Sequence, residues 1–270
     1  EYKEIPEYKE INYNMSLSDF KVIYYWEYGH RMLARLVGLF ALIPLIYLFL
    51  RFKNKRKKLL KYSIIFFLIC FQGFLGWFMV KSGLVNNTDV SHFRLAIHLS
   101  TALTILSVVF WFILKIIDVQ NFNNKISPYF LKLFLLFIIV QIVLGAFLAG
   151  LDGGLLYNTW PYMNGYFIPS DIIVDDLYLI ESVNNPSVIQ FYHRIVAYII
   201  VLFLIALNYL FIKRKMNLKY LLILNIAIFL QVFLGIITLI TGVKITYASL
   251  HQLGSILVLT SLLLIIYKNN

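Results

Sequence analysis

The chain contains seven uninterrupted apolar runs, and these runs restrict its fold more than any other feature of the sequence. A helix of about 20 apolar residues spans the hydrocarbon core of a bilayer, where only helices and closed barrels satisfy their backbone polar groups. The runs lack the two-residue alternation that barrel strands require. We therefore predict an all-α polytopic membrane protein with seven transmembrane helices. Their predicted ranges are 22–50, 60–81, 94–117, 128–150, 189–213, 219–241 and 247–268.

The net charge of +11 is concentrated in alternate loops of this predicted topology. Seven Lys and Arg residues lie in 51–61 and four lie in 213–219, whereas the opposite loops, 1–21, 82–93 and 151–188, carry most of the acidic residues. Basic loops face the cytoplasm or the mitochondrial matrix by the positive-inside rule. The charge therefore indicates membrane orientation, and we expect no nucleic-acid partner.

A sequence repeat divides the chain into two halves. In each half one helix begins with a His-Arg pair, the next contains Gln-x-Phe-Leu-Gly, and the third contains a histidine. The matching elements are His30-Arg31, Gln72–Gly76 and His98 in the first half, and His193-Arg194, Gln231–Gly235 and His251 in the second. A further helix with Gln141 and Leu144-Gly145 precedes the second set, and no equivalent precedes the first set in this chain. Because internal repeats share a helix count, we predict two pseudo-repeated four-helix bundles, residues 1–117 and 118–270, with the first helix of the first bundle absent.

Four of the five histidines lie near the outer ends of their helices, two in each half: His30, His98, His193 and His251. Two histidines on separate helices at similar depth can ligate a haem iron. The residue four positions later is small in every case, namely Ala34, Ala102, Ala197 and Ser255. Small residues would let a porphyrin lie against the helix, although close packing of membrane helices favours them as well.

Three charged residues accompany the two His-Arg pairs. Arg31 and Arg194 are candidate contacts for haem propionates, because a guanidinium group matches the geometry of a carboxylate; the alternative is interfacial snorkelling. Glu27 lies one helical turn before His30, whereas the matching position in the second half is Gln190. This asymmetry indicates chemistry at the first-half site and simple binding at the second. The alternative for Glu27 is a structural acid near a helix N-terminus.

The sequence resembles the heme A synthase family, in its mitochondrial and proteobacterial branch. The matching stretches are Pro6–Glu10, Met15–Lys21, Glu27–Arg31, Gly154–Pro161, His193-Arg194 and His251-Gln252, which span nearly the whole chain in order. The family has eight transmembrane helices in two four-helix halves. By that comparison this chain lacks the first transmembrane helix, and we expect a further helix to be encoded upstream of Glu1.

The resemblance implies a function and a role for each site residue. The family oxidises a methyl group of haem O to the formyl group of haem A for cytochrome oxidase. His193 and His251 correspond to the ligands of a bound haem B cofactor, and His30 and His98 to the site of the substrate haem O. Glu27 corresponds to the catalytic acid. The metal is thus haem iron, reached through these four histidines.

The expected partners are haem O, membrane lipid, a haem O synthase and a second copy of the chain in a homo-oligomer; the sequence does not identify an electron donor or acceptor. The expected location is the bacterial plasma membrane or the mitochondrial inner membrane, with both haem sites toward the outer side.

Two alternative functions remain: a dihaem b-type electron-transfer protein, and a haem transporter or chaperone. Electron transfer across a membrane is the poorer fit, because all four histidines lie on one side.

Overall fold

The computed structural model describes residues 2–51, 56–83, 88–173, 177 and 179–270, so part of the predicted basic loop, residues 52–55, lies outside the described residues. Within these ranges seven helices are long and apolar enough to cross a membrane, which confirms the predicted all-α, seven-helix membrane fold. They are α2 (Leu17–Arg51), α3 (Arg56–Gly83), α4 (His92–Ile116), α5 (Pro128–Gly150), α6 (Pro186–Lys213), α7 (Leu218–Ile240) and α8 (Ile245–Lys268). Shorter elements are η1 (Tyr2–Glu4), α1 (Pro6–Glu10), η2 (Gly153–Leu155) and η4 (Ile180–Asn184).

Polar caps set the beginnings of several of these helices. The hydroxyl oxygen of Ser16 accepts a hydrogen bond from the backbone N–H of Asp19 (3.2 Å), so α2 begins five residues before the predicted position, at Leu17. Asn185 caps α6 by accepting from the backbone N–H of Ser187 at 2.9 Å, and Pro186 occupies the first helical position. Such caps satisfy amide groups that the first helical turn leaves unpaired. The helices therefore extend beyond the apolar runs from which they were predicted.

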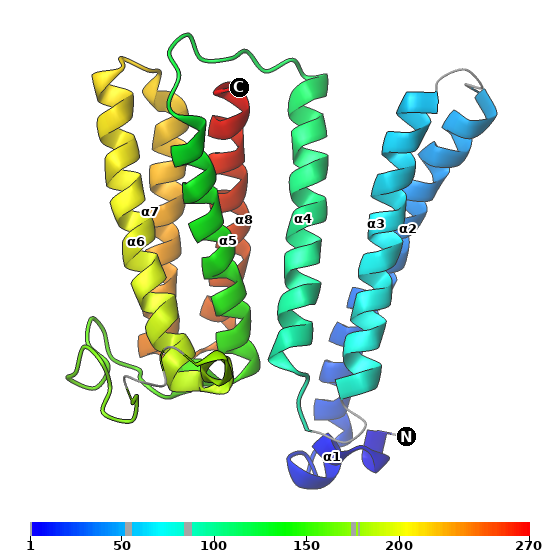
Figure 1. Ribbon diagram of the computed structural model, residues 1–270. Helices are drawn as coiled ribbons and strands as arrows, with labels where there is room; N and C mark the ends of the chain where they lie inside the picture. The colour runs from blue at the N-terminus through cyan, green and yellow to red at the C-terminus, as the bar shows by residue number, and fades with distance from the viewer. Residues whose placement is uncertain (1, 52–55, 84–87, 174–176, 178) are drawn as a thin grey trace. The chain divides into compact units, whose positions relative to one another are not determined.

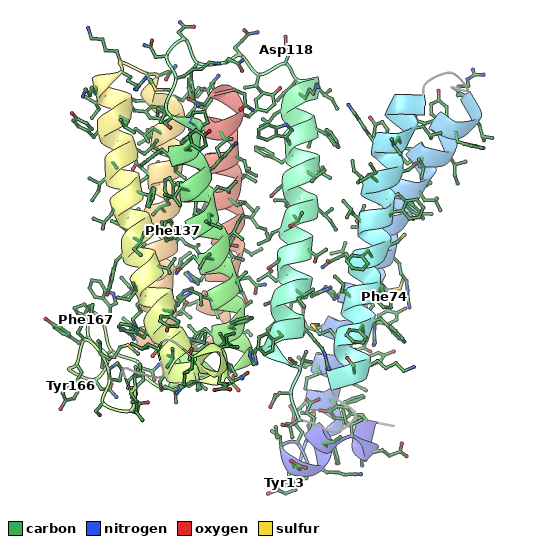
Figure 2. All side chains as sticks on the ribbon, in the orientation of Figure 1. Tyr13, Phe74, Asp118, Phe137, Tyr166 and Phe167 are labelled. Atoms are coloured by element: carbon green, nitrogen blue, oxygen red, sulfur yellow. The ribbon has the colours of Figure 1, made fainter. Side chains whose placement is uncertain are left out.

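The C-terminal unit, residues 109–270, is an antiparallel four-helix bundle made of α5 to α8 (Figure 1). Helix α5 packs against α6 and α8, and α7 packs against α6 and α8, so the four helices close around one core. Each helix contributes a side chain with no exposed surface: Phe134, Leu207, Leu224 and Leu262. Midway along α5, the ring of Phe137 lies 5.2 Å from that of Phe203 (Figure 2). Helices α5 to α8 lie within the range 118–270 that the repeat assigns to the second half.

The N-terminal unit, residues 1–108, contains α1, α2, α3 and most of α4. Helices α2 and α3 run side by side in opposite directions (Figure 1). All 35 residues of α2 are described, and none is buried within the chain. The boundary between the two units falls inside α4, after Val108, whereas the sequence repeat placed it after residue 117.

The described residues between α5 and α6, namely 151–173, 177 and 179–185, lie at one end of the C-terminal unit (Figure 1). Tyr166 and Phe167 lie on this segment, and Asp118 lies at the opposite end of the same unit (Figure 2). Met163 is 1% exposed and packs with Ile172, Val188 and Phe191, which anchors the segment to the start of α6. Irregular backbone is thereby kept at an end of the bundle, away from its apolar middle, as membrane proteins require.

Candidate functional site

The structure brings His193 of α6 and His251 of α8 face to face. Both lie near the first residues of their helices, at the end of the bundle that carries residues 151–185. Their ring centres are 6.5 Å apart and the ring planes are inclined by 73°. Both side chains are partly buried. The predicted pairing of two histidines from separate helices at one depth is therefore present in the geometry.

The tautomer of His251 is fixed by a carbonyl group of α7. Its Nδ1 lies 3.0 Å from the backbone oxygen of Gln231, which can only accept, so Nδ1 carries the proton. The side-chain Nε2 of Gln231 donates in turn to the backbone oxygen of His251 at 2.8 Å. A protonated and bonded Nδ1 leaves the lone pair of Nε2 available to a metal, as is usual for metal-binding histidines.

His193 makes a different set of contacts. The side-chain Nε2 of Gln141, on α5, lies 3.1 Å from Nε2 of the His193 ring. Nδ1 of His193 and Oε1 of Gln141 are buried and have no hydrogen-bond partner among the described residues. Buried polar atoms without partners are costly. The ring therefore has unused bonding capacity at the place where the two histidines meet.

These two histidines fit the axial ligands of a haem. Two nitrogen–metal bonds of about 2 Å each, on opposite faces of one iron, place the ring centres roughly 6 Å apart, close to the observed 6.5 Å. A haem iron needs only two protein ligands, because the porphyrin supplies the others. Among the residues that the structure describes, no three His, Cys, Asp or Glu side chains cluster to hold a bare metal ion.

In the N-terminal unit the other two histidines differ in burial and in their contacts. His98 of α4 is partly buried, and Nε2 of Gln72 lies 3.1 Å from its Nδ1 and donates to its backbone oxygen at 2.9 Å. His30 of α2 is exposed, although it lies close enough to His98 for their charges to interact. Beside it, Glu27 and Arg31 form an ion pair of 2.9 Å with side chains 47% and 50% exposed.

The other predicted propionate contact, Arg194, holds the segment 157–162 in the structure. Its two terminal nitrogens donate to four backbone oxygens, those of Tyr157 (3.0 Å), Thr159 (3.0 Å), Pro161 (3.4 Å) and Tyr162 (3.3 Å). Its Nε is buried without a partner among the described residues. That nitrogen is the donor left for a further ligand, and the propionate contact stays a prediction.

A second polar cluster ties the same segment to α6. The carboxylate of Asp171 accepts hydrogen bonds from Ser187, at 2.6 Å, and from the hydroxyl of Tyr157. Burial raises the pKa of Asp171, but these hydrogen bonds outweigh it and hold the pKa below its ordinary value. Burial and the bond to Asp171 together raise the pKa of Tyr157. The segment is thus held by an ionised carboxylate as well as by Arg194.

Residues 1–263 match the family of cytochrome oxidase assembly proteins. The chain is 60% identical to the heme A synthase of Pelagibacter ubique (strain HTCC1062), over all of this chain and 80% of that protein. It is 42% identical to the heme A synthases of Rickettsia bellii (strain OSU 85-389) and Rickettsia felis, over 96% of this chain and 79% of each relative. The chain belongs to the cytochrome oxidase assembly protein family. This membership confirms the resemblance seen in the sequence.

This cytochrome oxidase assembly protein is an integral membrane protein. Some contacts of its site residues were not predicted from the sequence. The contacts of Gln72, Gln141 and Gln231 with histidines were not predicted, although each glutamine stands four residues before a glycine and therefore shares a helix face with it. That spacing was the available signal. The carbonyl contacts of Arg194 had no signal, because the sequence does not reveal which backbone oxygens approach a side chain.

Proposed function

We propose that this protein is a heme A synthase, which oxidises a methyl group of haem O to the formyl group of haem A. The observation that carries the proposal is the pair of facing imidazoles, His193 and His251, at 6.5 Å in a four-helix bundle. The names of the relatives support the same activity, since three of them at 42–60% identity are called heme A synthase.

The C-terminal unit holds the cofactor, haem B, in this proposal. His251 presents Nε2 because Nδ1 donates to the carbonyl of Gln231, and His193 provides the second ligand from α6. Bound there, haem supplies redox chemistry that no amino-acid side chain provides, while the protein supplies position and electrostatics. Arg194 holds segment 157–162 beside His193 and offers Nε to a propionate.

The N-terminal unit holds the substrate, with His30 and His98 beside the haem O iron. Two successive oxidations of the methyl group give a geminal diol, which loses water to form the aldehyde. Each oxidation replaces a C–H bond by a C–OH bond and needs an external oxidant that takes two electrons, and Glu27 is the group placed one turn from His30 to transfer the protons that move with them. Its carboxylate lies 2.9 Å from the guanidinium group of Arg31. Arg31 is also the candidate contact for a propionate of haem O.

The orientation of both sites follows from the charged loops. His193 and His251 lie at the ends of α6 and α8 away from the basic residues of 213–219, and within the other unit His30 lies toward the end of α2 away from Arg51. The positive-inside rule places such basic loops in the cytoplasm or matrix, so the haem sites face the outer side of a bacterial plasma membrane or a mitochondrial inner membrane. A haem O synthase in the same membrane is the partner that would deliver the substrate, and a homo-oligomer is the proposed assembly.

The test is to supply haem O to the purified protein in lipid vesicles and to identify the extracted haems by chromatography and mass. We expect conversion of haem O to the formyl product by wild-type protein and none by His98→Ala. Haem O returned unchanged by a protein that retains its own haem B would contradict the proposal. That result would favour the electron-transfer protein or the haem chaperone instead.

A further inference from the structure

One arrangement recurs at three of the four histidines. In each case a glutamine and the glycine four residues after it lie on one helix, and both contact a histidine on the following transmembrane helix. We call such a glutamine and glycine a Gln–Gly pair. The three cases are Gln72 and Gly76 with His98, Gln141 and Gly145 with His193, and Gln231 and Gly235 with His251.

The glycine of each pair lets the imidazole ring lie on the helix backbone. A Cβ atom added at Gly76 or Gly235 would lie 2.9 Å from Cε1 of the facing histidine, and one at Gly145 would lie 3.2 Å away. These separations are shorter than ordinary contacts between carbon atoms, which are about 3.5–4.0 Å. Any other residue at these positions would therefore push the ring away from the helix.

The glutamine of each pair contacts the same histidine through hydrogen bonds. Gln72 and Gln141 approach a ring nitrogen with their side-chain amides, both at 3.1 Å. Gln231 differs, because its backbone oxygen accepts from Nδ1 of His251 and its side chain bonds the histidine backbone. In all three cases the ring is held by a steric surface on one side and by a polar partner one turn away.

Close packing of membrane helices is the rival explanation for these glycines, since small residues favour it. That explanation predicts contacts with the backbone or with varied side chains of the neighbouring helix. The nearest atoms at Gly76, Gly145 and Gly235 all belong to a histidine ring. Gly29, Gly38 and Gly73, the last only three residues from Gly76, have open space where a Cβ would stand, and a Cβ at Gly83 or Gly254 would meet Val90 or Gln231 instead of a histidine. The contact with histidine is therefore specific to the Gln–Gly pairs.

We propose that the Gln–Gly pairs are positioning residues that fix the ring planes of His193, His251 and His98. The inference rests on the proposed haem B site and adds to it the groups that orient its ligands. Partners of this kind commonly change metal affinity 10- to 100-fold when they are removed. The 73° angle between the two rings is then a property that the Gln–Gly pairs impose.

The test compares haem B affinity and the ferric low-spin electron paramagnetic resonance spectrum of purified full-length variants. The largest g value of such a spectrum depends on the angle between the two imidazole planes. We expect Gly145→Ala, Gly235→Ala and Gln141→Leu to lower haem affinity by about 10-fold or more and to shift that g value. Gly73→Ala is the matched control and should leave both quantities unchanged. Gln231→Leu should have a smaller effect than Gln141→Leu, because the bond to Nδ1 of His251 comes from the backbone.

Two other outcomes would contradict the proposed haem B site and the positioning role separately. A wild-type protein that binds no haem B would overturn the proposed site itself, whatever the variants do. Wild-type haem binding with unchanged affinity and spectrum in Gly145→Ala, Gly235→Ala and Gln141→Leu would overturn the positioning role alone. Thermal unfolding of the haem-free proteins separates misfolding from misplacement, since Ala is favoured over Gly in a helix. If either glycine variant unfolds without haem, the affinity and spectrum of Gln141→Leu decide the question.

Discussion

The two histidine pairs use the same residues in different surroundings. In the C-terminal unit both rings are partly buried, each contacts a Gln–Gly pair, and the two face each other at 6.5 Å. In the N-terminal unit only His98 has such contacts among the described residues, and His30 lies on a helix without buried residues. An ion pair with side chains about half exposed, Glu27 with Arg31, stands beside His30.

This difference indicates how one type of ligand can serve two purposes. Rings held by several fixed partners lose little freedom when they bind a metal, which favours a permanently bound group. An exposed histidine on a helix without buried residues suits a group that must enter and leave, such as a substrate with a long isoprenoid tail. The carboxyl group of Glu27 beside the exposed histidine can carry a proton, whereas the matching residue of the C-terminal unit is the neutral Gln190. We infer that the asymmetry separates a cofactor site from a substrate site.

Removal of a cofactor ligand should have the largest effect. We expect His193→Ala and His251→Ala to lose about nine-tenths or more of the bound haem B, because each removes a proposed iron ligand as well as its ring contacts. His30→Ala should retain haem B near the wild-type level. Pyridine haemochrome assay of the purified proteins gives the ratio of haem to protein. A normal low-spin haem spectrum in the His193→Ala, His251→Ala double variant would show that the ligands lie elsewhere.

Glu27→Gln tests the substrate side of the comparison. The change preserves size but removes the proton-carrying group, so we expect haem A formation to fall by about 100-fold, with haem O or a hydroxylated intermediate accumulating. Haem B content should remain close to wild type. The measurement is the ratio of haem A to haem B in extracts. Arg31→Gln breaks the same ion pair and leaves the acid in place; because Arg31 is the candidate propionate contact, we expect this variant to need more haem O but still to form haem A.

A purely structural role for Glu27 gives the opposite pattern. Stability and haem B content would then fall in Glu27→Gln, while turnover per folded molecule would stay nearly constant. Normal haem A per haem B in this variant would remove the catalytic role.

The helices were largely predictable from the sequence, because apolar length alone identifies a membrane span. The predicted range 128–150 equals α5. Other beginnings were placed late, since polar caps lie outside the apolar runs: α2 begins after Ser16 and α6 after Asn185. Polar capping residues therefore start these helices before the first residue of the apolar run.

The histidine pairs were predictable from their repeat, whereas their partners were not. The meeting of Gln141 with His193 depends on the rotation of α5 against α6, which a sequence of mostly apolar residues does not specify. The same holds for Arg194, whose partners are backbone oxygens of an irregular segment. The sequence repeat therefore identifies the candidate site residues, whereas the packing of the helices determines which groups contact them.

Arg31 and Arg194 occupy matching positions in the repeat, and their contacts provide a third test. Arg194→Ala removes four bonds to the backbone of 157–162, so we expect this segment to be cleaved by protease about 10-fold faster, which corresponds to roughly one charged hydrogen bond. Arg194→Lys should be intermediate, since an ammonium group cannot span four oxygens. Arg31→Ala, which disrupts a side-chain ion pair in the other unit, should leave the cleavage rate unchanged. Equal effects of the two arginine variants would contradict the distinct roles.

The smallest expected effect is a pH dependence confined to the C-terminal unit. The pKa of Asp171 is held below its ordinary value when segment 151–185 is folded onto α6. Its stabilising contribution is therefore complete above the unfolded pKa of about 3.9, and it is lost as the pH falls through the folded value. Because the side chain is mostly exposed, we expect protease cleavage of the segment to rise only about threefold between pH 5 and the acid limit. Asp171→Asn should be cleaved faster than the wild-type protein at pH 5 and should lack the rise in cleavage at acid pH. Pepsin digestion over that pH range measures both differences. A variant that retained the full pH dependence would assign it to another group and leave Asp171 as an ordinary surface carboxylate.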